Sequence, residues 1–427
     1  MTIAFTFVHA ADLHLDSPFR GAAGAPPAVR ERLRESTFAA LRRLVDAAKR
    51  ERADFVVLAG DLYDAEDRSL RAQLRFQQAA EELADSGIAV YIAHGNHDSL
   101  GGAQAKLAWP DAAYVFGPDE PSCFPAYRRD GRLAAYVYGV SYGTAAERGN
   151  LAAKFRPRPD GPFHLAVLHA NVDGDPAHDN YAPCRLGELT AAGFDYWALG
   201  HVHQRRVLHE YPHVVYPGNA QGRSAKETGP RGAYVVRVSD TGQIRLDFRD
   251  LADVLWRETA VSVSGLEREQ ELKARLLETA ESVRLEAQGR PVMLRIRLEG
   301  RGPLHEPLQR EGAADAWLAE LRDWLGEPEA DGGWVWPERV TVRTAPAEDW
   351  RRSASAGGFL GELAAQAARV AADPAEARRT LRDALGELAL QPRVRQWLDG
   401  LTDADVRELT ERAADLAAAL LQSGGDA

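Results

Sequence analysis

The sequence contains little cysteine and no long apolar run. Only two cysteines, Cys123 and Cys184, occur in 427 residues, and they do not form a C-x-x-C pair. The chain therefore lacks both a disulfide framework and the thiolates of a zinc ribbon. No stretch approaches the roughly 18 consecutive apolar residues of a membrane span. The apolar run at residues 3–8 has no basic segment before it, so it predicts a strand and not a signal peptide. We expect a cytoplasmic protein that makes no membrane contact.

A surplus of positive charge is also missing. The chain has 52 Lys and Arg against 63 Asp and Glu, a net charge of −11, which argues against coating DNA or anionic lipid through bulk basicity. Residues 1–250 carry 29 basic and 31 acidic side chains, whereas residues 251–427 carry 23 and 32. Eleven of the twelve histidines lie at or before His213. Because imidazole is a common metal ligand and general acid–base, the chemistry is expected in the first half.

The length of the chain favours two to three domains of about 150 residues each. Residues 1–250 alternate short β-rich runs with amphipathic stretches, which predicts an α/β (α+β) domain with two face-to-face sheets and outer helices, four αββα layers in all. Residues 251–352 restart as strand, helix, strand, helix and strand, which predicts a second, small α/β domain. Residues 353–427 begin with a linker near 353–358 and continue as a helical segment.

The last helix carries a narrow apolar seam. Its members fall at alternating spacings of three and four: Val406, Leu409, Ala413, Leu416 and Leu420. Two interpretations stay open at this point. The seam either packs within the chain as part of a helical hairpin or forms a docking site for a partner's helix.

Five short polar segments each lie at or just past the end of a predicted strand. They are Asp12-Leu13-His14, Gly60-Asp61-Leu62-Tyr63-Asp64, Gly95-Asn96-His97-Asp98, Leu168-His169-Ala170-Asn171 and Gly200-His201-Val202-His203. In layered α/β folds, ligands bind at the carboxyl ends of the strands. Residues two apart in extended chain point to the same side, so Asp12 and His14 form one ligand pair and His201 and His203 another.

Seven side chains in these segments are candidate metal ligands: Asp12, His14, Asp61, Asn96, His169, His201 and His203. Seven donors exceed what one tetrahedral ion accepts but suit two ions that share a carboxylate. Oxygen and imidazole donors without thiolate favour Mn²⁺ or Fe²⁺ over structural zinc, while Zn²⁺ stays open. Each segment alone is typical of an ordinary turn or core histidine, whereas the ordered set of five predicts a metal centre.

The order DxH, GDLYD, GNHD, H and GHVH resembles that of the calcineurin-like metallophosphoesterase superfamily over residues 1–250. The stretches at 9–19 (HAADLHLDSPF), 196–204 (YWALGHVHQ) and 216–223 (YPGNAQGR) are similar to those of SbcD/YhaO-type DNA repair exonuclease subunits. Protein Ser/Thr phosphatases of the superfamily are disfavoured, since they carry GNHE where this chain has GNHD.

The resemblance implies a division of the ligands between two divalent ions. One ion would be held by Asp12, His14, Asp61 and His203, and the other by Asp61, Asn96, His169 and His201, with Asp61 bridging. His97 is left outside both sets, so it is implied to stabilise or protonate the leaving oxygen, and Asp98 to orient it. Two downstream stretches, His178–Pro183 and Gln221–Arg223, either touch phosphate or are merely solvated.

The resemblance also implies a function and partners. We expect a Mn²⁺-dependent DNA exonuclease, with endonuclease activity open, whose metal site lies under a capping domain at 251–352. It would work with an SbcC-like or YhaN-like coiled-coil ATPase, docked on residues 353–427, and would form a homodimer. Two alternatives stay open: a phosphodiesterase acting on small molecules or cyclic nucleotides, and a DNA-end-binding scaffold subunit whose metals chiefly stabilise the fold.

Overall fold

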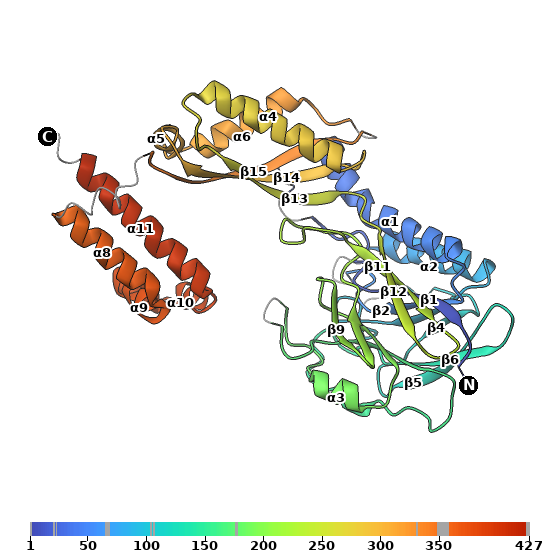
Figure 1. Ribbon diagram of the computed structural model, residues 1–427. Coiled ribbons are helices and arrows are strands. Elements are labelled where there is room, and N and C mark those ends of the chain that lie inside the picture. Colours follow the sequence, from blue (N-terminus) through green and yellow to red (C-terminus); the bar gives the residue numbers. More distant parts are fainter. Residues whose placement is uncertain are drawn as a thin grey trace. The chain divides into compact units, whose positions relative to one another are not determined.

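The computed structural model describes residues 2–19, 22, 24–64, 69–102, 105, 107–175, 178–329, 332–347 and 358–423 (Figure 1). All but the last residue of the expected linker at 353–358 lies outside these ranges. The chain divides into two compact units. The first comprises residues 1–259, 276–296 and 315–340, and the second comprises residues 260–275, 297–314 and 341–427. The domain boundaries expected at 250 and 352 stay predictions.

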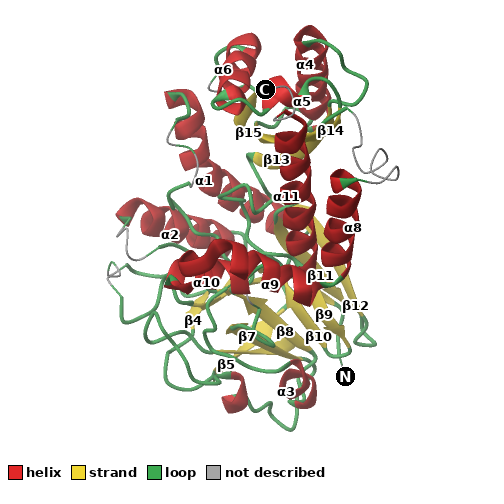
Figure 2. Ribbon diagram, turned by 90° about the vertical axis from the view of Figure 1, so that its left-hand side faces the viewer, coloured by secondary structure: helices red, strands yellow, loops and turns green. Residues whose placement is uncertain are grey.

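Two six-stranded sheets, drawn in yellow in Figure 2, build most of the first unit. The first sheet has the order β12 (Ile244–Asp250), β11 (Gly232–Val238), β1 (Phe5–Ala10), β2 (Phe55–Ala59), β3 (Ala89–Ala93) and β4 (Ala113–Val115). The second has the order β5 (Ser122–Tyr127), β6 (Leu133–Gly139), β7 (His164–His169), β8 (Tyr196–Gly200), β10 (His213–Tyr216) and β9 (Arg206–Glu210). Strands β1 to β4 are parallel, as are β6, β7, β8 and β10.

Three apolar cores separate four layers. Helices α1 (Pro27–Arg50) and α2 (Leu70–Asp85) cover the outer face of the first sheet, where Leu41 and Phe76 are buried. Phe7 and Leu165 meet between the two sheets. The 3-10 helix η2 (Ala152–Lys154) and helix α3 (Leu186–Ala191) cover the second sheet over Trp197. The expected αββα sandwich is therefore confirmed.

The strand register places the polar segments at one edge of the sandwich. Ala10 at the end of β1 pairs with Leu58 near the end of β2, and Ala59 pairs with Ala93 at the end of β3. In the second sheet, His169 at the end of β7 pairs with Gly200 at the end of β8. Because parallel strands end together, all five segments leave their strands at this carboxyl edge.

A three-stranded sheet follows in the chain, with the order β13 (Leu255–Ser262), β14 (Val292–Arg301) and β15 (Val335–Ala345). Its helices are α4 (Glu269–Glu286), α5 (His305–Leu308) and α6 (Ala313–Leu325). Apart from the short α5, this is the expected alternation of strand and helix. Within the first unit, Trp256, Met293 and Trp334 pack with Val29 and Leu33 of α1.

The C-terminal residues form helices α8 (Phe359–Ala372), α9 (Pro374–Leu385), α10 (Pro392–Asp399) and α11 (Asp403–Ser423), with the 3-10 helix η4 (Gly386–Leu390). Of the expected seam in α11, Val406 is buried, whereas Leu416 and Leu420 are 62% and 64% exposed. Packing within the described chain therefore covers only part of the seam, and docking of a partner's helix stays a prediction. The buried residues Ala414 and Ala418 pack against α8, because small side chains let the two helices approach closely. Among the described helices, none has the length and apolar character that a bilayer crossing requires.

Candidate metal centre

Left-handed backbone conformations turn the ligand side chains at the carboxyl edge. The φ angles of Asp12, His14, Asp61 and His201 are 52°, 43°, 53° and 101°. Residues other than glycine rarely adopt such positive values. Two backbone hydrogen bonds hold these turns. The N–H of Asp12 donates to the carbonyl of Gly60 at 3.0 Å, and the N–H of His14 donates to the carbonyl of Asp61 at 3.0 Å. Such strained residues cluster at functional sites, where the surrounding structure over-determines them.

Three glycines allow close packing around His169. A Cβ atom on Gly60 would lie 2.4 Å from the Nδ1 of His169, and one on Gly200 would lie 1.9 Å from the carbonyl oxygen of Ala59. A Cβ atom on Gly95 would lie 2.4 Å from the Oδ1 of Asp61. Only Gly60, with a φ of 91°, also needs the conformational freedom of glycine. The other two are required for space.

The first ligand group centres on two histidine rings that face each other. The Nε2 atoms of His14 and His203 lie 3.2 Å apart, and the Oδ2 of Asp61 lies 3.7 Å from the Nε2 of His14. On the far side of each ring, Nδ1 donates to a carboxylate: His14 to Asp64 at 2.8 Å and His203 to Glu227 at 2.6 Å. When both rings are neutral, their Nε2 lone pairs point at the same position, and a cation between them would relieve their repulsion. The donor set therefore fits a metal ion.

The second ligand group centres on His169. Its Nδ1 donates to the carbonyl of Ala59 at 2.8 Å, which leaves Nε2 for a ligand contact. That Nε2 lies 3.0 Å from the Oδ1 of Asn96 and 3.4 Å from the Oδ2 of Asp61. Asp61 thus faces both groups, as expected for a bridging carboxylate.

A loop after β7 orients His201, the last of the seven expected ligands. The Nε2 of His201 donates to the carbonyl oxygen of Asp179 at 2.7 Å, which leaves its Nδ1 for a metal. The buried Asn171 holds the loop, because its side-chain amide donates to the carbonyls of Asp175 and Asp179. The ring of His178 lies 5.4 Å from that of His201, centroid to centroid. Of the two downstream stretches, His178–Pro183 therefore lies at the site.

Burial shapes the electrostatics of the ligands. It raises the pKa of Asp12 to about 6 and lowers that of His14 to about 4. Burial also raises the pKa of Asp61, but the charge of His169 and its hydrogen bond outweigh burial and hold this pKa well below the ordinary value. Burial lowers the pKa of His169, yet the charge of Asp61 outweighs it and raises the pKa to about 9. A divalent cation at this position would stabilise the carboxylates in their charged form and the imidazoles in their neutral form.

His97 lies beside the ligands with its side chain 41% exposed. Its backbone N–H donates to the Oδ1 of Asp61 at 2.9 Å, and its Nδ1 lies 3.1 Å from the Oδ1 of Asp64. Burial lowers the pKa of His97, but the hydrogen bond to Asp64 and the charge of Asp61 outweigh it and raise the pKa to about 9. One carboxylate, Asp64, thus contacts both His14 and His97.

Asp98 is fully buried beneath two of the ligand loops. Its carboxylate accepts hydrogen bonds from the backbone N–H groups of Asp61, Leu62 and Gly95 at 3.2, 2.9 and 2.7 Å. The Nδ1 of His94 lies 3.0 Å from the same carboxylate. The expected role of Asp98 in orienting His97 stays a prediction, and these contacts give it a clear task in holding the ligand loops.

A cleft of about 840 Å³ opens in front of Asp64, His97 and His203. Its cationic lining residues are Arg205, Arg206, Arg223, Lys226 and Arg231. Arg206 is paired with Asp175 at 2.6 Å, and Arg231 donates to backbone carbonyls and to Asn219. Arg223 lies 3.6 Å from Asp64, and its Nε is buried without a hydrogen-bond partner among the described residues. The cleft thus presents positive charge beside the candidate metal centre.

The sequence interpretation missed two residues of the site. Asp64 belongs to the GDLYD segment, so its position three residues after the ligand Asp61 was an available signal. Glu227 lies in a loop with no local motif, and only the fold brings it to His203. The stretch Gln221–Arg223, for which phosphate contact and solvation both stayed open, divides: Arg223 lines the cleft, whereas the buried side chain of Gln221 bonds to the backbone of Gly222, Asp253 and Val254.

The chain is similar to known metallophosphoesterases. The family described as calcineurin-like phosphoesterase matches residues 5–205, and the one described as metallophosphoesterase YhaO, middle domain, matches residues 256–345. The uncharacterized metallophosphoesterase YhaO of Bacillus subtilis (strain 168) is 39% identical over 417 residues, 97% of each chain. The DNA double-strand break repair protein Mre11 of Methanopyrus kandleri is 25% identical, over 75% of this chain and 71% of that protein. A solved dimetal phosphatase from Danio rerio is 16% identical, with a TM-score of 0.32 over 55% of this chain and 93% of that one.

Proposed function

We propose that this chain, which belongs to the calcineurin-like metallophosphoesterase family, is a phosphodiesterase acting on DNA. The observation that carries the proposal is the pair of facing imidazoles, each oriented by a carboxylate, of which His203 lines a cleft with cationic side chains. The similarity to a protein named for DNA double-strand break repair supports DNA as the substrate.

The residues present fit two divalent ions. Asp12, His14, Asp61 and His203 would hold one, and Asp61, Asn96, His169 and His201 the other. When bound, such ions act as Lewis acids that stabilise negative charge on a phosphoryl group. The oxygen and imidazole donors, without thiolate, support Mn²⁺ first, with Fe²⁺ and Zn²⁺ as the alternatives to be tested by metal analysis.

Two side chains outside the ligand sets act on the substrate. His97 faces the cleft while Asp64 holds its ring, so it is placed to donate a proton to the leaving oxygen. Arg223 lines the same cleft with donor capacity to spare, so it neutralises and orients the phosphate that is attacked. The other basic side chains of the cleft would bind neighbouring phosphates of the DNA backbone.

A substrate panel with metal analysis tests the proposal. The parent protein, with Mn²⁺, should degrade linear duplex or single-stranded DNA and hydrolyse bis-p-nitrophenyl phosphate. His97→Gln should reduce turnover by about 100-fold or more, the usual contribution of a general acid, while about two metal ions per chain are retained. His209→Gln, on strand β9, is the matched control and should behave as the parent.

Three outcomes would contradict the proposal. Loss of metal from His97→Gln would make His97 a ligand. Turnover of cyclic nucleotides without turnover of DNA would identify a small-molecule phosphodiesterase. DNA binding without hydrolysis, under every divalent ion tested, would identify a scaffold subunit.

The C-terminal helices are the proposed docking element for an SbcC-like or YhaN-like coiled-coil ATPase. Support comes from large apolar side chains left in solvent there: Leu390, Trp397, Leu416 and Leu420. Co-elution of the two purified proteins should be lost in Leu416→Ser/Leu420→Ser and retained in the matched exposed pair Thr380→Ser/Arg379→Lys. A homodimer in the cytoplasm completes the proposal, and sedimentation of the purified protein tests the dimer.

A further inference from the structure

A second hollow, of about 700 Å³, opens at the end of the first sheet opposite the metal centre. It is lined by the start of β1, the turn after α1, the β5–β6 turn and the β11–β12 turn. Strand β1 begins here at Phe5, and the ligand Asp12 follows its other end. The rise of a six-residue strand therefore separates the two sites by about 20 Å.

Five arginines gather on this hollow, although the chain as a whole is acidic. They are Arg52, Arg128, Arg129, Arg237 and Arg245, from three separate turns and their flanking strands. Three carboxylates, Glu51, Asp54 and Asp130, line it as well, so two positive charges remain in excess. The arginines that no carboxylate neutralises are the ones that can bind an anionic ligand.

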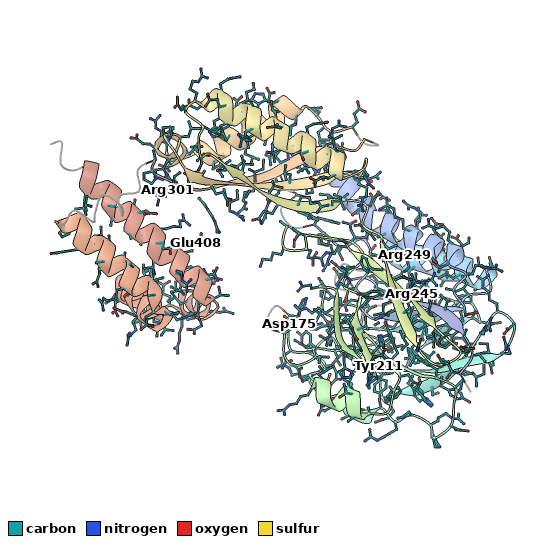
Figure 3. The ribbon with its side chains drawn as sticks, viewed as in Figure 1. Asp175, Tyr211, Arg245, Arg249, Arg301 and Glu408 are labelled. Carbon is teal, nitrogen blue, oxygen red and sulfur yellow. The ribbon has the colours of Figure 1, made fainter. Side chains whose placement is uncertain are left out.

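Two of the arginines are neutralised by carboxylates. Arg237 binds Glu51 at 2.5 Å and also Asp247, and Arg245 binds Asp247 at 3.0 Å. Glu51 is further held by Arg249 at 2.7 Å, and both Arg245 and Arg249 are labelled in Figure 3. This part of the wall is a closed ion-pair network.

Two other arginines, Arg52 and Arg129, have no carboxylate partner among the residues that the structure describes. Asp54 directs its oxygens to the backbone N–H groups of Thr6 and Arg129, at 2.9 and 3.1 Å. The guanidinium of Arg129 donates only through Nε, to the carbonyl of Ala53 at 3.3 Å. In the part of the chain that the structure describes, no carboxylate lies within ion-pair distance of the guanidinium of Arg129 or Arg52.

Arg128 contributes a third donor. Its closest carboxylate is Asp130 at 3.6 Å, which Arg132 already holds at 2.8 Å. The Nε of Arg128 is buried, and among the described residues it has no hydrogen-bond partner. A buried donor without a partner is rare in folded proteins and calls for a ligand or water.

We propose that this hollow binds the phosphate group of a nucleotide or of a nucleic-acid strand. Arginine forks recognise phosphate through paired N–H donors, and Arg52, Arg128 and Arg129 bring such donors to the hollow. The volume lies within the range of small-ligand sites. The site needs neither the metal centre nor its ions, so it goes beyond the proposed catalytic function.

Fluorescence anisotropy of a labelled oligothymidylate, with EDTA present, tests the proposal apart from catalysis. Arg52→Gln/Arg129→Gln should weaken binding at least tenfold, and the slope of log K against log salt should fall by about 1.4, or 0.7 for each lost phosphate contact on a single strand. The charge-matched control is Arg156→Gln/Arg185→Gln, two exposed arginines over the second sheet, and it should bind as the parent. Melting curves confirm that both variants fold.

Competition identifies the source of the phosphate. Displacement of the labelled strand by ADP supports a nucleotide site, whereas weakened strand binding without displacement by ADP supports a strand site. Unchanged binding in Arg52→Gln/Arg129→Gln, or equal weakening in the control, overturns the proposal. Hydrolysis of bis-p-nitrophenyl phosphate with Mn²⁺ should be the same in parent and both variants, which separates failure here from failure of the proposed function.

Discussion

Asp98→Asn distinguishes a structural carboxylate from a catalytic one. One oxygen of Asp98 accepts the N–H groups of Asp61 and Gly95, and the other accepts that of Leu62 and lies by the Nδ1 of His94. An asparagine keeps a single acceptor oxygen, so its NH₂ group must face at least one of these N–H groups in a fully buried position. An unpaired buried N–H costs about 1–3 kcal/mol, and the remaining hydrogen bonds lose the help of the negative charge.

We therefore expect Asp98→Asn to lower the free energy of unfolding by about 2–4 kcal/mol. Urea denaturation followed by tryptophan fluorescence measures it. Asp195→Asn is the matched control, because the exposed Asp195 accepts a backbone N–H from His164 that one asparagine oxygen can still accept, so its effect should stay within about 0.5 kcal/mol. If Asp98→Asn unfolds at the same urea concentration as the parent yet loses turnover, the carboxylate acts on catalysis alone and this reasoning is refuted.

Three further predictions concern the metal centre. Glu227→Gln should weaken Mn²⁺ binding by about 10–100-fold, because the hydrogen bond at 2.6 Å from His203 to Glu227 orients that ligand. Calorimetric titration measures the Mn²⁺ affinity, and an unchanged affinity would contradict this role of Glu227. Gly200→Ala should destabilise the fold by about 1–3 kcal/mol or more, because the new Cβ would lie 1.9 Å from the carbonyl oxygen of Ala59. Gly117→Ala is the control: its Cβ would have nothing within 4 Å, so this variant should melt at the same temperature as the parent. Removal of metal by EDTA should lower the melting temperature, since an ion at 100 times its Kd stabilises the fold by about 2.7 kcal/mol; identical melting with and without Mn²⁺ would show that no ion binds the folded state.

The central strands could be predicted from sequence, whereas three of the edge strands, β4, β5 and β9, could not. The buried strands β2 and β7 each contain a run of consecutive apolar residues followed by a polar turn, a pattern that indicates a buried strand from sequence alone. Strand β4 has only three residues, and β5 contains Pro125 and half-exposed side chains. Strand β9 is largely exposed, with the sequence RVLHE. These strands form because a neighbouring strand offers backbone hydrogen bonds, and their own local sequence does not reveal that neighbour.

The same distinction separates the expected from the missed site residues. The seven ligands follow directly on buried strands, so a parallel sheet brings them together once the strands are placed. Glu227 comes from a loop 24 positions beyond His203, and only the fold brings its carboxylate to that ring. The contact of α11 with α8 was missed for a related reason: apolar spacing favoured the leucines, but the close approach of the two helices buries Ala414 and Ala418.

The net charge of −11 predicts weak DNA binding only if the charge is spread evenly over the chain, whereas arginines gather at the metal cleft and at the opposite hollow. Arg223 lines the metal cleft and Arg52 and Arg129 line the opposite hollow, whereas the acidic surplus resides mainly in residues 251–427. Within a Debye length of about 8 Å at physiological salt, a bound phosphate responds to the arginines beside it and not to distant carboxylates. DNA affinity should therefore depend steeply on these few residues and on salt, and little on the total charge. Charge-neutralising substitutions on the exposed face of α4, such as Glu281→Gln, should leave it unchanged.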